Sequence, residues 1–462
     1  MMNKPLRPGN SAAIEELRAL LGEHLSTGPS ILDAHGRDQG YAEQHLPDAV
    51  VFPGSTQEVS QIVKICARHG CPVIPYGTGT SLEGQVIPVS GGISLDLSRM
   101  NRVIDIHEKD LDAVVQPGVT RTQLNDALRS SGLMFTVDPG ADASMGGMAS
   151  TRASGTNTVR YGTIRENILA LEVVLPDGEI IRTGSRARKS ASGYDLTHLF
   201  IGSEGTLGII TELTVRLHGL PESILAATCA FPTISAAVDT VIMAIQCGLP
   251  MARIELLDEV QMRGMNLLHS DLGLQETPYL FLEFHGSETG VKEQVETFRE
   301  IADGFEATDF QFAARMEDRN RLWAARHQAY FAAKALRPGA SGLVTDCCVP
   351  ISELARCIHR TKQAIGISGL VAPLTGHVGD GNFHLVILVD PDDAADLRAA
   401  QDLAGTINRI ALSLGGTVTG EHGVGTGKRK YMEAEHGAAY ALMQRLKAAI
   451  DPDGIMNPGK MV

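Results

Sequence analysis

The sequence predicts an α+β protein with two lobes, and three observations point to that class. A chain of 462 residues is too long for one hydrophobic core, so two or three domains are expected. Before Pro221, short strands alternate with helices and glycine-rich turns, whereas after Pro221 longer strands alternate with amphipathic helices. The composition, 43% hydrophobic and 20% charged, is that of a soluble globular protein.

Four segments are expected along the chain. Residues 1–45 contain one amphipathic helix, Ala12–Leu25. Residues 46–220 form the first lobe, and residues 221–415 form a second lobe that caps it. Residues 416–462 end in a stretch rich in turn formers but too mixed for a disordered tail, so we expect this segment to return to the first lobe.

In the first lobe, a helix through Thr56 carries Glu58 in its first turn, and a second helix spans Thr120–Ser131. A Pro-Asp-Gly turn at residues 176–178 predicts a hairpin, and the segment Thr136–Glu166 is expected to be irregular. The expected strands are Ala49–Pro53, Val73–Tyr76, Ile93–Leu97, Ala113–Gln116, Ala170–Leu175, Ile180–Arg182 and Leu207–Leu217.

The second lobe is expected to be an antiparallel sheet with helices packed on one face. Its expected strands are Leu225–Phe231, Arg253–Leu257, Tyr279–His285, Phe310–Ala314 and Asn382–Asp390. Its expected helices are Ile234–Gln246, Val291–Ala302, Asn320–Ala335 and Ala394–Leu414. A last helix, Gly437–Ile450, lies in the C-terminal segment.

Charge and cysteine usage restrict the class of function. A net charge of −14 argues against a nucleic-acid groove, and the one basic cluster, Arg182–Lys189, is short and typical of a solvated loop. The seven cysteines show no C-x-x-C pair, which favours buried thiols in a reducing compartment. We find no apolar signal segment and no uncharged apolar run of about 18 residues. We therefore expect a cytoplasmic protein, with peripheral membrane attachment left open.

The first glycine-rich loop, Pro75–Gly84, follows a strand but does not open a helix. A dinucleotide-binding Gly-x-Gly turn needs that helix, because the phosphate lies on the helix N-terminus. Backbone N–H groups of glycines and the hydroxyls of Thr78, Thr80 and Ser81 can hold phosphate in another way. An ordinary tight turn is the alternative for this loop taken alone.

Two further loops strengthen the case for a cofactor. Residues 137–162 combine many small side chains without the charge or proline of a disordered segment. Residues 202–208, Gly-Ser-Glu-Gly-Thr-Leu-Gly, repeat the pattern. Three loops of small residues in one lobe predict close backbone approach to a large flat cofactor that carries a pyrophosphate.

Histidines and a carboxylate beside glycines occur twice near the end of the chain. His377 and His384 flank the turn Gly379-Asp380-Gly381, which can bring the two rings together, and Glu421 adds an oxygen ligand. Two imidazoles and one carboxylate leave coordination positions open, as a catalytic metal requires. From these residues alone, a metal site, a catalytic base and ordinary structural histidines all stay open.

The loop motifs, together with Gly-His-Val-Gly-Asp-Gly-Asn-Phe-His at 376–384 and Thr-Gly-Glu-His-Gly at 419–423, resemble a known family. The family is the vanillyl-alcohol-oxidase-like one, and the similarity over about residues 45–462 is to its D-2-hydroxy acid branch, which includes FAD-linked D-lactate dehydrogenases and glycolate oxidase flavin subunits. The resemblance implies a PCMH-type FAD-binding lobe of two subdomains and a ferredoxin-like antiparallel cap.

The resemblance also implies residue roles. His422 is implied as the catalytic base, Arg326 as the substrate-binding arginine, and His377, His384 and Glu421 as ligands of a divalent zinc or manganese ion. FAD is expected to be noncovalent, since the first two loops contain no histidine. The implied flavin-binding residues are Pro75, Gly77, Thr78, Gly79, Thr80, Ser81, Pro139, Gly140, Ala141, Ser144, Gly146, Gly147, Ser154, Gly155, Asn157, Tyr161, Gly162, Glu204, Gly205, Gly208, Ile210 and Asn457.

The activity implied is oxidation of a D-2-hydroxy acid, with D-lactate to pyruvate as the first choice. A metal lowers the pKa of a hydroxyl that it contacts, His422 takes the proton, and the hydride goes to the flavin. Val344 and Val386 align with residues that hold a second carboxylate in 2-hydroxyglutarate relatives, so a distal carboxylate would lack a partner here.

A cytochrome, a quinone or an electron-transfer flavoprotein is expected as electron acceptor, and a homodimer is open. The alternatives are D-2-hydroxyglutarate or glycolate oxidation, a non-catalytic flavin subunit, or a metal hydrolase or oxygenase using the same three ligands.

Overall fold

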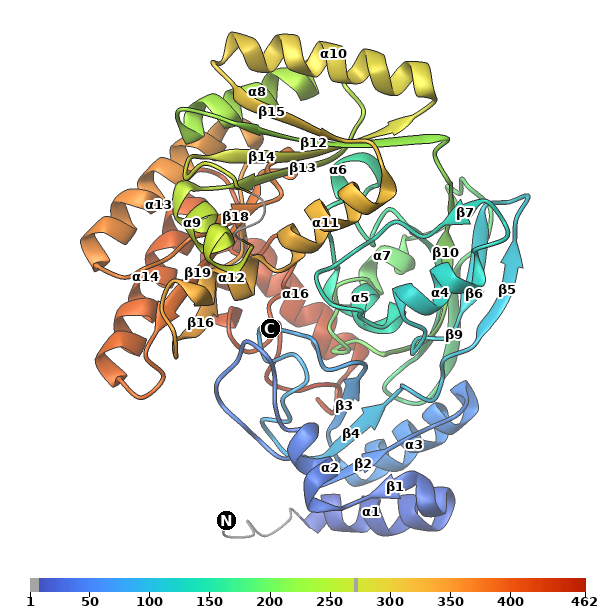
Figure 1. Cartoon of the computed structure of the whole chain (residues 1–462). Coiled ribbons are helices and arrows are strands. Elements are labelled where there is room, and N and C mark those ends of the chain that lie inside the picture. Colours follow the sequence, from blue (N-terminus) through green and yellow to red (C-terminus); the bar gives the residue numbers. More distant parts are fainter. Residues whose placement is uncertain (1–7, 270–272) are drawn as a thin grey trace. The chain divides into compact units, whose positions relative to one another are not determined.

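The computed structural model describes residues 8–269 and 273–462, and the chain forms two compact units (Figure 1). Unit 1 consists of Met1–Ser154, Gly162–Leu220 and Glu421–Val462. Unit 2 consists of Gly155–Tyr161 and Pro221–Gly420. In the described part of the chain, no helix combines the length and apolar character needed to cross a bilayer.

The first subdomain of unit 1 is a small sheet covered by helices. Its strand order is β1-β2-β4-β3, with β2, β4 and β3 parallel and β1 antiparallel to β2. The strands are β1 Leu25–Ser26, β2 Ala49–Val51, β3 Val73–Tyr76 and β4 Ile93–Asp96. The helices are α1 Pro8–Leu21, α2 Pro29–Ala34 and α3 Thr56–His69. The predicted first-turn role of Glu58 is confirmed: α3 starts after Ser55, whose side chain accepts the Glu58 N–H.

The second subdomain of unit 1 is an antiparallel sheet with the order β5-β6-β10-β8-β9. The predicted hairpin is confirmed as β8 and β9. The strands are β5 Val103–His107, β6 Asp112–Val115, β8 Ile168–Val174, β9 Ile180–Gly184 and β10 Ile209–Arg216, with β7 Leu133–Met134 and β11 His218–Gly219 as a separate pair. The remaining helices of unit 1 are α4 Arg121–Ala127, α5 Met145–Thr151, α7 Leu196–Phe200, α15 Met432–His436 and α16 Ala438–Ile450.

The expectation of an irregular segment over Thr136–Glu166 is wrong in part. It contains α5 and the short α6, Thr158–Tyr161, which belongs to unit 2. Ser144 caps α5 by accepting the N–H of Gly147 at 3.3 Å. Met145, Met148 and Ala149 are buried at helical spacing. The sequence therefore contains a helix period here, although glycines interrupt it.

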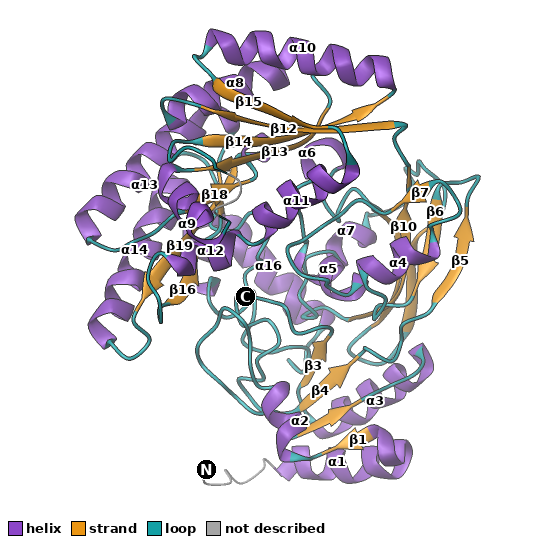
Figure 2. Cartoon of the chain, viewed as in Figure 1, coloured by secondary structure: helices purple, strands orange, loops and turns teal. Residues whose placement is uncertain are grey.

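Unit 2 is built on one antiparallel sheet (Figure 2). Strands β15, β12, β14 and β13 lie side by side in that order, with α8 between β12 and β13 in sequence and α10 between β14 and β15. This is the split βαβ arrangement of a ferredoxin-like domain, so the predicted cap architecture is confirmed. The strands are β12 Ser223–Ala230, β13 Met251–Leu257, β14 Tyr279–Gly286, β15 Thr308–Ala313, β16 Ser341–Val344, β17 Cys347–Cys348, β18 Leu374–Gly376 and β19 Asn382–Val389.

Helices cover both faces of this sheet, which corrects the expectation of one covered face. Leu280, Leu282 and Phe284 of β14 are buried in a core shared with α8, α10, α13 and α14, whereas Tyr279 and Phe281 belong to a core shared with α9, α11 and α12. Because side chains alternate along a strand, β14 is apolar on both faces. The helices are α8 Ile234–Gln246, α9 Glu259–Leu268, α10 Glu288–Gly304, α11 Met316–His327, α12 Ala329–Ala335, α13 Leu354–Ser368 and α14 Ala394–Ser413.

Candidate active site

In unit 1, the three glycine-rich loops meet one another. A Cβ on Gly77 would lie 2.3 Å from the Ser144 Oγ, and a Cβ on Gly205 would lie 2.2 Å from the Pro75 ring. Residues 77–92, between β3 and β4, contain no helix, as the sequence predicts. The first loop therefore contacts both the second and the third, and glycine is required at each crossing.

The surroundings of these loops fit a cofactor that carries a diphosphate. Thr78 and Thr80 hold their hydroxyls 3.3 Å apart in an exposed position. A Cβ on Gly140 would meet no atom within 4 Å, so this backbone is open to a neighbour. Hydroxyl donors beside backbone without side chains are suited to phosphate oxygens and to a flat ring.

Some predicted flavin residues face protein atoms. A Cβ on Gly146 would lie 2.6 Å from Pro117, and a Cβ on Gly208 would lie 2.7 Å from Val173. These two glycines allow close packing within the lobe. Gly147 donates to the cap residue Ser144, Ile210 is buried in the core of the lobe, and Pro139 and Ala141 lie in the second loop.

Gly155, Asn157 and Tyr161 belong to unit 2, while their neighbours Ser154 and Gly162 belong to unit 1. The Asn157 Oδ1 accepts from the Arg253 Nε at 3.0 Å, and the Tyr161 hydroxyl lies 2.7 Å from the His285 Nδ1. The segment that the sequence assigns to the flavin is thus also anchored on β13 and β14.

The predicted turn does bring His377 beside His384. Strands β18 and β19 form a hairpin in which Thr375 lies opposite His384, and the 3-10 turn Val378–Asp380 joins them. The two imidazole rings are 5.4 Å apart between centroids and nearly perpendicular. Ring nitrogens of the two residues lie within 4.8 Å of each other, close enough to share one ion.

Hydrogen bonds set the proton position on both rings. The His377 Nδ1 donates to the Glu255 carboxylate at 2.7 Å, and the His384 Nδ1 donates to the Thr345 carbonyl at 3.2 Å. Neither acceptor can donate, so each Nδ1 carries a proton, and in the neutral imidazole Nε2 then carries the lone pair. This tautomer is the one in which Nε2 serves as a metal ligand.

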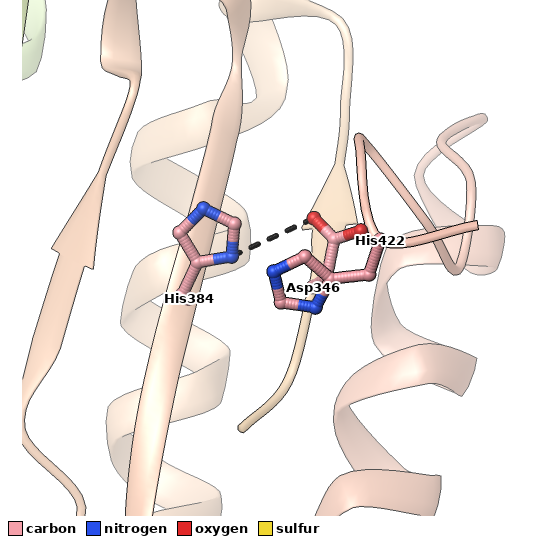
Figure 3. Close-up of side chains that lie close together, drawn as sticks. All are labelled: Asp346, His384 and His422. Atoms are coloured by element: carbon pink, nitrogen blue, oxygen red, sulfur yellow. Dashed lines mark ion pairs between the residues drawn. The ribbon is translucent and has the colours of Figure 1, made fainter. Parts of the chain in front are cut away.

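Asp346 lies next to His384, and Figure 3 marks the ion pair between them with a dashed line. Its carboxylate is 3.6 Å from the His384 Nδ1 and is fully buried. It also accepts hydrogen bonds of 2.8 Å from the Asn382 Nδ2 and the Thr419 Oγ1. The carboxylate therefore ties β19 to the segment that leads into Glu421.

Glu255 joins the predicted metal ligand to the predicted substrate arginine. One carboxylate oxygen accepts from His377, and the other pairs with the Arg326 Nη2 at 2.5 Å. Burial acts to raise the pKa of the Glu255 carboxyl, but the charges and hydrogen bonds of His377 and Arg326 outweigh burial and lower this pKa. Arg326 is buried, and its Nε has no hydrogen-bond partner among residues 8–269 and 273–462.

Glu255 and Asp346 were missed in the sequence. Asp346 directly precedes the short strand β17, Cys347–Cys348, and no local pattern marks it as a site residue. Glu255 carried a signal: Arg253 and Glu255 are charged residues two apart in the apolar strand β13, so both lie on one face of it. Buried charges of this kind need partners, and the pair Arg253–Glu283, at 3.6 Å, is the second such contact.

Glu421 and His422 open the last segment of unit 1. The His422 carbonyl accepts from the Gln85 Nε2 at 2.7 Å, which ties this segment to the loop after β3. Glu204, predicted at the flavin, directs its carboxylate to the backbone N–H groups of Val424 and Gly425. Burial raises the pKa of the Glu204 carboxyl, and these hydrogen bonds oppose the rise. The Asn457 Nδ2 donates to the carbonyls of Gln85 and Glu204.

Comparison with known protein families gives one match in the N-terminal part of the chain and one in the C-terminal part. Residues 47–184 match the model of an FAD binding domain, and residues 220–461 match the C-terminal domain of FAD linked oxidases. The fold and these matches define an FAD-dependent oxidoreductase. The chain belongs to the family of FAD-linked oxidases, which favours a flavoenzyme over the metal hydrolase or oxygenase left open above.

Two relatives are similar over almost the whole chain. "Probable D-lactate dehydrogenase, mitochondrial" of Danio rerio is 49% identical, over 98% of this chain and 93% of the relative. "D-lactate dehydrogenase [cytochrome], mitochondrial" of Arabidopsis thaliana is 45% identical, over 97% of this chain and 80% of the relative. The structure of p-cresol methylhydroxylase has a TM-score of 0.83 at 20% identity, covers 99% of this chain and 97% of that one, and shows the shared fold.

The prediction of a cytoplasmic protein is wrong. Both relatives carry "mitochondrial" in their names, which points to that compartment. The prediction had rested on the absence of a signal segment, an apolar span and paired cysteines. Those absences do not distinguish one compartment from another.

Proposed function

We propose that the protein oxidises D-lactate to pyruvate with noncovalent FAD and passes the electrons to an external acceptor. Two relatives at 49% and 45% identity are named D-lactate dehydrogenases, and both domains of the FAD-linked oxidase family are present. The acceptor we favour is a cytochrome, since the Arabidopsis thaliana relative is named for one. Quinones and electron-transfer flavoproteins are the alternatives for the acceptor.

The observation that carries the proposal is the buried cation Arg326. Its side chain is only 9% exposed, Glu255 balances its charge, and its Nε points to no acceptor. A buried donor without a partner costs about 1–3 kcal/mol, and the carboxylate of a bound ligand would supply the missing acceptor. The carboxylate of a 2-hydroxy acid has the planar shape that a guanidinium binds.

A divalent ion is proposed beside Arg326, held by His377, His384 and Glu421. Both histidines have the tautomer that leaves Nε2 as the ligand atom. Gly420 lies against Asp346 and Asn382, since a Cβ on it would be 3.0 Å and 2.1 Å from their polar atoms. Glu421 is the next residue along the chain, and its Cα is only about 3.8 Å from that of Gly420. Two nitrogens and one oxygen suit zinc or manganese.

The roles of the chain's own groups follow from this arrangement. Arg326 binds and orients the substrate carboxylate. A divalent ion held by His377, His384 and Glu421 would, when bound, lower the pKa of a hydroxyl in contact with it. His422 accepts the hydroxyl proton at its imidazole, as a histidine can near neutral pH. FAD, when bound, supplies the two-electron acceptor for the Cα hydrogen. Glu255 keeps both Arg326 and His377 in position.

The apolar pair Val344 and Val386 supports a substrate without a second charge. The two residues lie directly opposite each other in the β16–β19 pair, and Val386 is only 4% exposed. A distal carboxylate placed there would lose its hydration without gaining a partner. We therefore propose lactate, or a longer apolar 2-hydroxy acid, over 2-hydroxyglutarate.

Anaerobic flavin reduction by a panel of 2-hydroxy acids tests the proposal. We expect D-lactate to bleach the flavin absorbance, and L-lactate, glycolate and D-2-hydroxyglutarate to do so at least tenfold more slowly. Faster reduction by D-2-hydroxyglutarate or by glycolate would contradict the choice of lactate. A flavin that stays oxidised with every acid would contradict the enzyme activity itself and indicate a flavin subunit without catalysis.

A further inference from the structure

The segment Glu421–Lys428, here called the base loop because it carries His422, is folded around two glycines with positive φ. Gly423 has φ +82° and Gly425 has φ +50°. The N–H groups of Val424 and Gly425 consequently converge on one carboxylate, that of Glu204, with distances of 2.7 Å to Oε1 and 2.8 Å to Oε2. Successive N–H groups in such a turn form a concave binding site for an anion, and here the anion is a side chain of the protein.

Contacts on both sides of Glu204 hold the rest of the base loop. The Gln85 Nε2 donates to the His422 carbonyl at 2.7 Å. The Glu83 carbonyl accepts from the N–H groups of residues 426 and 427 at 2.8 and 3.0 Å. The Glu83 carboxylate lies 3.1 Å from the Lys428 Nζ. The loop that follows β3 thus binds the base loop at residue 422 and at residues 426–428, on either side of the two N–H groups that bind Glu204.

Glu204 is itself held rigidly. It has φ +53°, an uncommon conformation for a residue with a side chain, and it is only 3% exposed. Its carbonyl accepts from the Asn457 Nδ2 at 2.7 Å. A Cβ on Gly423 would lie 2.4 Å from the Glu204 Oε1, so the base loop approaches the carboxylate as closely as glycine allows.

We propose that Glu204 is a positioning residue that fixes the base loop, and with it the catalytic His422, onto the loops of the FAD-binding lobe. Both of its carboxylate oxygens accept backbone N–H groups of the base loop. The inference rests on the proposed function only for the role of His422, because every contact used lies inside unit 1. The same contacts give Glu204 a function distinct from holding the cofactor.

Glu204→Gln tests the proposal with the FAD-loaded protein. A glutamine can accept one of the two N–H groups, but its amide presents N–H to the other, which loses its acceptor. We expect hydrogen exchange at the Val424 and Gly425 amides to become at least tenfold faster. The FAD content should be unchanged, and the first-order rate of flavin reduction by D-lactate should fall at least tenfold at saturating substrate.

Glu212→Gln is the matched control. Glu212 lies in the same lobe on β10 and pairs with Arg182 at 3.0 Å, away from the base loop. This variant should match the wild type in both measurements. Gln85→Met provides a milder variant. It removes the bonds from the Gln85 Nε2 to the His422 carbonyl and to the Glu204 Oε1, and the bond from the Glu83 N–H to the Gln85 Oε1. The two bonds from the base loop to Glu204 remain, so exchange and reduction should change in the same direction but less.

Exchange that is unchanged in Glu204→Gln would overturn the proposal, as would loss of FAD with an undisturbed base loop. Amide hydrogen exchange is measured without substrate. The role of Glu204 can therefore be confirmed or rejected whether or not the proposed D-lactate oxidation is correct. If no hydroxy acid reduces the wild type while exchange at Val424 and Gly425 responds, the base loop is still held by Glu204 and the proposed function is what fails. If Glu204→Gln fails to fold, unchanged exchange in Gln85→Met would overturn the proposal.

Discussion

The glycine-rich loops of unit 1 and the β18–β19 hairpin of unit 2 differ in the groups that form them: backbone in the loops, and charged side chains around the hairpin. In unit 1, the absence of side chains at Gly77 and Gly205 lets loops cross at close range. In unit 2, buried charged groups meet, and Glu255 links His377 to Arg326. A surface made of backbone suits a large cofactor, whereas paired charges suit a small anion and a cation. Changes at the glycine crossings of unit 1 should therefore affect folding and cofactor retention, and changes around the hairpin should affect chemistry.

The largest effect is expected for His422→Ala. Removing a general base slows a proton-coupled step by about 10²- to 10⁴-fold, so flavin reduction by D-lactate should fall by about a thousandfold. FAD should be retained, because the base loop keeps its backbone bonds to Glu204. Stopped-flow absorbance measures the rate, and His436→Ala, a histidine at the end of α15, is the control. Reduction at the wild-type rate would show that another group takes the proton.

Gly205→Ala should test the backbone-built region. Gly205 has φ +70°, and a Cβ on it would lie 2.2 Å from the Pro75 Cγ. The left-handed conformation costs an alanine about 1–2 kcal/mol, and the clash adds about 1–3 kcal/mol. Urea unfolding should show a loss of about 3 kcal/mol, together with weaker FAD retention. Gly193→Ala, at φ +79° with no atom within 4 Å, should show only the conformational part.

Unit 1 also contains buried charged side chains, and Lys460 is one whose effect on stability can be measured. Burial lowers the pKa of Lys460 from 10.5 to about 8, and its Nζ donates to the Ile87 carbonyl at 2.6 Å. Between pH 8 and 10.5 the unfolded chain binds a proton that the folded chain does not, so stability rises with pH. Relative to Lys460→Met, the wild type should gain up to about 3 kcal/mol from pH 7 to 10.5. A pH-independent difference in urea unfolding would contradict this.

Glu255→Gln should give the smallest of these effects. The glutamine oxygen can still accept from His377, but the negative charge that strengthens the ligand is lost. Metal affinity should fall by about 10- to 100-fold, measured by competition with a chelator. Glu283→Gln is matched to it, because Glu283 is also buried and bonds a histidine, His285, that is not a predicted ligand. Equal affinities in both variants would indicate that Glu255 does not act on the metal.

Features with a local sequence pattern were predictable. Helix α8 has its predicted bounds, Ile234–Gln246, because a threonine cap precedes an apolar helix period. The His377–His384 contact was predictable because a glycine turn forces a short hairpin. Glu255 and Asp346 were not found, since their partners lie far away in sequence and only the tertiary fold brings them together. The contact of Glu204 with the base loop was not predicted for the same reason, because Glu204 and Val424 are 220 residues apart in the sequence.

We propose that a divalent ion takes part in the oxidation of D-lactate, and measuring flavin reduction with and without the metal tests this most directly. We expect about one divalent ion per chain in the FAD-loaded protein. After chelation, D-lactate should no longer reduce the flavin at an appreciable rate, and added zinc or manganese should restore reduction in the wild type but not in His384→Ala. If D-lactate reduces the flavin of the metal-free protein as fast as that of the untreated protein, the ion is not needed for the reaction and the proposed mechanism is wrong.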